Sequence, residues 1–122
     1  MTKWVGDWWS EQYPSFFVKG TVSADLPEDI TALNDTEVDI VMKYTGFYRS
    51  GDVEHLRGIT TYDEGTINMT VKYNNGILSY TINVSDGGLN GKYTLTNPHD
   101  RGSVRLQRLT EGKEDNSYCL LS

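Results

Sequence analysis

The sequence predicts an all-β fold, a single antiparallel up-and-down β-barrel of about eight strands. Three observations predict it: apolar and polar residues alternate along most of the chain, turn residues separate the alternating segments, and helical periodicity is nearly absent. Side chains of a strand point alternately to its two faces, so alternation indicates one dry face and one wet face. An open sheet of this size would leave its apolar face uncovered, whereas closure into a barrel buries it.

The clearest alternation runs through residues 37–44, where the even positions are apolar and three of the four odd positions are charged. The same period recurs downstream, although residues 52–61 alternate poorly and their inward face stays unassigned. With boundaries that shift by a few residues, the expected strands are 3–9, 15–23, 37–49, 52–62, 66–73, 77–84, 90–96 and 102–110.

Turn signals separate these segments. Asn74-Asn75-Gly76 is typical of a tight hairpin, because Asn and Gly tolerate the positive φ that such a turn needs. Short connections make consecutive strands antiparallel neighbours, which predicts a meander. One short helix is expected at 26–33, between the second and third strands, where Pro27 and two acidic residues are typical of a helix start. A plain loop with a single helical turn is the alternative.

The chain divides into a barrel domain, 1–110, and a flexible polar C-terminal tail, 111–122. The formal net charge of −6 argues against a nucleic-acid-binding protein, because such a protein needs excess Lys and Arg to displace counterions from phosphates. Two His and one Cys have no metal-ligand spacing, so neither a metal nor another cofactor is expected. Residues 1–20 lack the apolar core of a signal peptide, and we therefore expect a cytoplasmic protein.

Gly6-Asp7-Trp8 in the first expected strand resembles the Gly-x-Trp start of calycin-type barrels, the group of lipocalins, avidins and fatty-acid-binding proteins. The resemblance implies a cavity for a small, mostly apolar molecule. It also implies that Trp8 closes one barrel end, with Arg105 or Arg108 of the last strand packed across the indole. Alternation favours Arg108, because that residue shares the inward face of Leu106.

The expected inward face is rich in tyrosine. Several tyrosine hydroxyls in an apolar cavity can orient a ligand that carries a few polar atoms, although the same rings can simply fill a small barrel. The candidate ligand-binding residues are Tyr44, Tyr48, Tyr73, Tyr80, Tyr93, Trp8 and Arg108. His99-Asp100 beside Arg101 has the composition of a polar site at one rim, but it also fits a solvated turn.

Cys119-Leu120-Leu121-Ser122 at the C-terminus matches a prenylation box, which makes Cys119 a candidate lipidation site. The residues before it are acidic rather than basic, and no second cysteine is present. A single lipid chain gives only weak, reversible membrane association. A chance match at the end of the chain is the alternative.

Three functions fit this pattern. The leading interpretation is a non-enzymatic barrel that binds a small hydrophobic ligand. The second is an acidic interaction or inhibitor protein, viral or effector-like, that binds a partner with a basic surface. The third is a barrel enzyme, such as a cyclase or isomerase acting on an apolar substrate, with Tyr or His as acid or base.

Overall fold

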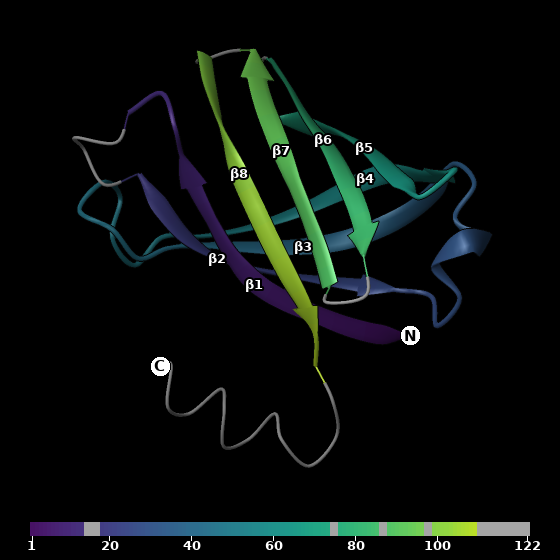
Figure 1. Cartoon of the computed structure of the whole chain (residues 1–122). Helices are drawn as coiled ribbons and strands as arrows, with labels where there is room; N and C mark the ends of the chain where they lie inside the picture. The colour runs from purple at the N-terminus through teal and green to yellow at the C-terminus, as the bar shows by residue number, and fades with distance from the viewer. Residues whose placement is uncertain (14–17, 74–75, 86–87, 97–98, 110–122) are drawn as a thin grey trace.

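The computed structural model describes residues 1–13, 18–73, 76–85, 88–96 and 99–109. Its eight strands form one closed antiparallel barrel in which each strand pairs with its neighbours in sequence and β1 pairs with β8, as Figure 1 shows. The expected fold class is confirmed. The strands are β1 (Thr2–Ser10), β2 (Lys19–Leu26), β3 (Thr36–Tyr44), β4 (Val53–Asp63), β5 (Thr66–Tyr73), β6 (Gly76–Ser85), β7 (Gly88–Thr96) and β8 (His99–Arg108).

Of the two alternatives expected at 26–33, a short helix or a loop with a single helical turn, the structure has the second. Leu26 belongs to β2, where it pairs with Thr2, and only a 3-10 turn, Ile30–Ala32, lies between β2 and β3. The Asp29 side chain caps this turn by accepting a hydrogen bond from the amide of Thr31. Leu33 is extended (φ −65°, ψ 119°), so the chain leaves the helical region after three residues.

Two expected strand boundaries also need correction. The third strand ends at Tyr44 rather than at 49, because the chain turns at 45–52 into β4. The second strand runs from Lys19 to Leu26 rather than over 15–23, and residues 14–17 lie outside the described part. The expected tail 111–122, including the Cys119 box, lies outside it as well.

The core is the interior of the barrel. Inward residues have even numbers in most strands and odd numbers in β5 and β7. In β4, whose inward face could not be assigned from the sequence, the even-numbered residues face inward. At the end where β1 begins, Leu33 is only 1 % exposed and closes the barrel from outside the sheet. No helix in the described ranges has the length and hydropathy needed to cross a membrane.

Close approach of β1 and β8 explains one glycine. Gly6 lies opposite Leu106, and a Cβ at Gly6 would overlap the carbonyl oxygen of Arg105. A larger residue would therefore push the two strands apart where the barrel closes.

We expect Gly6→Ala to lower the free energy of unfolding by about 1–3 kcal/mol or more, as overpacking does elsewhere. Urea denaturation followed by circular dichroism measures this change. The control is Asp7→Ala, which alters the exposed neighbour in the same strand. Equal stability of the two variants would show that β1 and β8 are not in such close contact.

Candidate functional site

Four of the five candidate tyrosines point into the barrel, and three gather near one of its ends. Tyr44, Tyr73, Tyr80 and Tyr93 are each at most 7 % exposed. We call the end at which β1 finishes and β4 begins the tyrosine end, because Tyr44, Tyr73 and Tyr93 lie near it. The opposite end holds mostly apolar side chains such as Leu26, Leu89 and Leu106.

Tyr48 is not on the inward face. It lies in the turn after β3 and is 46 % exposed, although its ring still packs edge-on against Tyr44 with the centroids 6.0 Å apart. The expectation that Tyr48 faces inward is therefore wrong, because β3 ends at Tyr44, before alternation can carry this residue inward.

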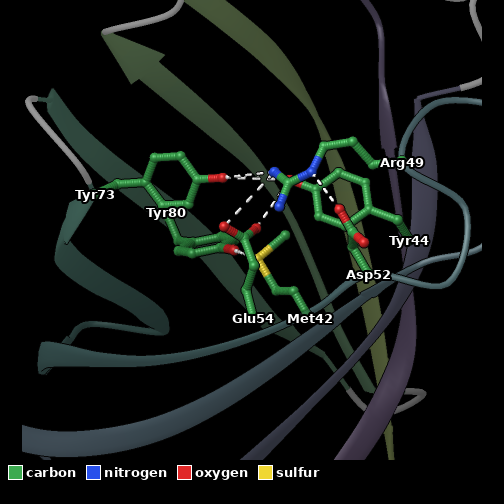
Figure 2. A network of polar contacts seen from close by, with 7 residues as sticks. All are labelled: Met42, Tyr44, Arg49, Asp52, Glu54, Tyr73 and Tyr80. Carbon is green, nitrogen blue, oxygen red and sulfur yellow. Dashed lines mark hydrogen bonds and ion pairs between the residues drawn. The ribbon is translucent and has the colours of Figure 1, made fainter.

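The tyrosine end carries an arginine that the sequence pattern did not single out (Figure 2). Arg49 Nη1 donates to the hydroxyl oxygens of Tyr44 at 3.1 Å and of Tyr73 at 3.4 Å. Its Nε donates to Asp52 Oδ2 at 2.8 Å, and its guanidinium lies 4.4 Å from the centre of the Tyr44 ring. One cation thus joins the β3–β4 turn to Tyr73 of β5.

Glu54 supplies the carboxylate of this network. It faces inward from β4, and Tyr44 Oη donates to Glu54 Oε1 at 2.9 Å. Glu54 Oε2 lies 3.8 Å from Arg49 Nη1, and the Glu54 side chain is only 16 % exposed. We call Tyr44, Arg49, Asp52, Glu54 and Tyr73 the Arg49 network.

A second tyrosine–carboxylate pair lies across the barrel. Tyr93 Oη donates to Asp100 Oδ2 at 3.0 Å, and Ser10 Oγ donates to Asp100 Oδ1 at 2.6 Å. The amide of Arg101 also donates to Asp100 Oδ1, at 2.8 Å. Asp100 therefore belongs to an ordered polar site rather than to a solvated turn.

Trp8 fills the space between the two pairs. Its ring packs edge-on against Tyr44 at 5.1 Å and against Tyr93 at 6.1 Å between centroids. The residue is 2 % exposed, and its Nε1 has no hydrogen-bond partner among the described residues. Gly20 lies opposite Trp8 in β2, and a Cβ there would come within 2.8 Å of this nitrogen, so the glycine makes room for the indole.

The expected contact between Trp8 and Arg108 is wrong. Arg108 has the inward parity of β8, but it is exposed and lies opposite Trp4, whereas Trp8 lies opposite Val104. Four residues of strand separate the two positions, about 13 Å. Arg105 lies over Trp9 instead, at 5.9 Å from its ring centre, and both residues have the outward parity of their strands.

Below the tyrosine end, the barrel interior is apolar and nearly full. The free space is about 20 Å³, which is close to the room that one water molecule needs. Tyr80 Oη donates to Met42 Sδ at 3.2 Å, so the hydroxyl of this buried ring is satisfied. The space is lined by Trp4, Val22, Ala24, Leu26, Ile40, Ile67, Met69, Tyr80, Ile82, Leu89, Val104 and Leu106.

The chemistry of these groups is that of holding and orienting rather than of proton removal. Burial raises the pKa of Tyr44, Tyr73, Tyr80 and Tyr93 above the usual value for tyrosine. At neutral pH these hydroxyls therefore keep their protons and donate hydrogen bonds. Across the described ranges, no three His, Cys, Asp or Glu side chains converge in a way that could hold a metal ion.

Arg49 and Glu54 are the site residues that sequence reasoning missed, and it left Asp100 undecided between a polar rim site and a solvated turn. Residues 52–61 alternate too weakly to show which face Glu54 occupies, and Asp100 precedes the clearly alternating part of β8. Counting back from the buried Val104 in steps of two would have placed Asp100 on the inward face.

We expect stability to fall as the pH rises above about 10. Below that pH both folded and unfolded chains keep the phenolic protons. Above it the unfolded chain releases protons that the four buried tyrosines retain, so the unfolded state is favoured. Urea titrations between about pH 8 and 11.5 measure this slope, and Tyr93→Phe should reduce it by about 1.4 kcal/mol per pH unit. An unchanged slope in Tyr93→Phe would contradict the raised pKa.

No protein-family model matches the chain, and neither a curated protein nor a solved structure matches it. The likeness to calycin-type barrels therefore consists of the closed, eight-stranded antiparallel architecture alone. The Trp–Arg contact that would have made the likeness more specific is replaced by tyrosine rings around Trp8.

Proposed function

We propose that this protein is a non-enzymatic barrel that binds a small apolar molecule in its interior. The observation that carries the proposal is the apolar lining of the free space below Tyr80. Among the residues of this lining, only Trp4 and Tyr80 carry a nitrogen or oxygen atom in the side chain. A site of this kind recognises a ligand by shape and by exclusion of water. The Arg49 network lies toward the tyrosine end and leaves this lining free of charge.

The small free space limits the ligand. About 20 Å³ holds no molecule larger than water until side chains move. Met69 is the side chain best suited to move, because its unbranched thioether adopts many shapes and lies against Gly58, where no side chain opposes it. The proposal therefore names a ligand of about one ring or a short chain.

A second candidate function, protein interaction, is favoured by the turn between β3 and β4. Phe47 is 87 % exposed, Tyr48 is 46 % exposed, and Arg49 follows them. Aromatic residues and arginine are the types that dominate binding energy at protein interfaces. The formal net charge of −6 suits a partner with a basic surface.

We expect benzene or indole to bind the purified protein saturably and to shift the methyl NMR signals of Ile67, Ile82 and Leu89. Ala24→Leu fills the free space and should weaken binding about tenfold or more, which corresponds to a loss of at least about 1.4 kcal/mol of binding free energy. Thr21→Leu adds the same side chain to the outer face of β2 and should bind as the parent does.

Leu89→Ala enlarges the space and should strengthen binding of the larger probe, indole. Native mass spectrometry of the freshly purified protein would identify a co-purified molecule. Unchanged binding in both Ala24→Leu and Leu89→Ala would rule out the interior as the site. Loss of binding in Phe47→Ser, with both interior variants unaffected, would favour the second candidate.

A further inference from the structure

The barrel has a seam at the tyrosine end where β4 and β5 are not paired. The ladder between β4 and β5 runs from Asp63↔Thr66 to Gly58↔Val71. The ladder between β3 and β4 continues to Lys43↔Val53. Residues 53–57 of β4 therefore pair with β3 on one side and, among the described strands, with none on the other.

Backbone direction shows which groups this leaves free. The amide of Tyr44 donates to the carbonyl of Asp52, so even-numbered residues of β4 direct their amides and carbonyls toward β3. The amide of Tyr62 follows the same rule by donating to Leu33. The amides and carbonyls of Val53 and His55 consequently point away from β3, into the seam.

Side chains hold the seam on its inner side. Tyr73 at the end of β5 reaches the Tyr44 hydroxyl at 3.3 Å and Arg49 Nη1 at 3.4 Å (Figure 2). Glu54 faces inward from the unpaired stretch itself. The Arg49 network thus crosses the seam inside the barrel, while the backbone edge of Val53 and His55 has no covering strand in the described structure.

Charge on the outer side of the seam is positive although the chain as a whole is acidic. Lys43 lies opposite Val53, and Lys72 lies at the end of β5 across the seam. Both are exposed, and neither forms an ion pair within the described part of the chain. Arg57, by contrast, is neutralised by Asp39 at 3.0 Å and Glu37 at 3.5 Å.

We infer that the free edge of β4 at residues 53–57 binds an extended acidic peptide by strand addition. Main-chain groups of the peptide pair with Val53 and His55, which is how an exposed edge normally recruits a strand. Acidic side chains of the peptide face outward, toward Lys43 and Lys72. The positions between them face Glu54 and Leu56, which suits a small side chain with a hydroxyl, such as threonine.

This inference is independent of ligand binding in the interior. The peptide contacts the outer edge of β4, whereas the interior site lies below Tyr80. Binding of benzene or indole and binding of the peptide can therefore be lost separately.

The test uses the full chain and the peptide acetyl-Glu-Thr-Glu-Thr-Glu-amide, followed by ¹⁵N NMR and amide hydrogen exchange. We expect the amides of Val53 and His55 to exchange fast in the free protein and to become protected about tenfold or more with peptide. Two further peptides of the same sequence supply the backbone control, one N-methylated at its odd-numbered residues and the other at its even-numbered residues. Only every second amide of an added strand faces β4 and donates to it. One of the two N-methylated peptides should therefore lose binding, and the other should retain it.

Charge is tested by reversal. Lys72→Glu should weaken peptide binding about threefold to tenfold, and the basic peptide with Lys in place of Glu should not bind. Lys19→Glu is the matched control, because it reverses the charge of an exposed lysine in β2 at the same end of the barrel and should leave binding unchanged. His55→Pro removes the amide that faces the seam without touching the ladder to β3, and it should abolish binding in a folded protein.

Several results would overturn the inference. One is protection of the Val53 and His55 amides in the free monomer, and another is equal binding of both N-methylated peptides. Absence of binding at about 1 mM peptide is a third. Protection that rises with protein concentration, together with a dimer in sedimentation, would show that a second copy of the chain covers the edge instead.

Discussion

Closure of the barrel between β1 and β8 is the constraint on which the rest of the structure depends. The ladder from Trp4↔Arg108 to Ser10↔Gly102 joins the first and last strands of the meander. Once both edges are joined, every strand has an inside and an outside, and each residue is assigned to one of them by parity. Gly6 allows this joining because the carbonyl of Arg105 occupies the place of its missing side chain.

Closure also explains why the polar groups of the interior gather where they do. A barrel of this size is filled by its own side chains, so an inward carboxylate survives only where donors reach it. Two tyrosines supply such donors. The rings of Tyr44 and Tyr93 pack against Trp8, and their hydroxyls donate to Glu54 and Asp100, respectively. The middle of the barrel has no such donors and is apolar.

Period-two alternation was sufficient to predict the strands and the closed barrel, because both follow from local pattern and short connections. It was insufficient where the outcome depended on long-range register. Arg108 has the predicted parity, but the pairing of the first strand with the last places it opposite Trp4 rather than Trp8. Nothing local in either strand sets that register.

The candidate site shows the same limit. The inward tyrosines of β3, β5, β6 and β7 follow from alternation. The prediction that Tyr48 also faces inward is wrong only because β3 ends at Tyr44. Arg49 could not be predicted, because a turn residue has no face until the turn is folded. Its role depends on Asp52 and Tyr73, which lie on opposite sides of the seam.

The seam between β4 and β5 explains both the place of Arg49 and the free backbone of β4. A full ladder between β4 and β5 would continue past Gly58 with backbone hydrogen bonds, whereas here the inner side is joined by side-chain contacts of Arg49, Tyr44 and Tyr73. Partly exposed side-chain contacts separate at lower free-energy cost than a stretch of β-ladder, because water replaces their hydrogen bonds directly. The stretch of the β4–β5 junction that side chains hold is therefore also the place where, in the described structure, the backbone of Val53 and His55 has no strand partner. The closed barrel thereby keeps a short edge at the tyrosine end, beside the guanidinium of Arg49.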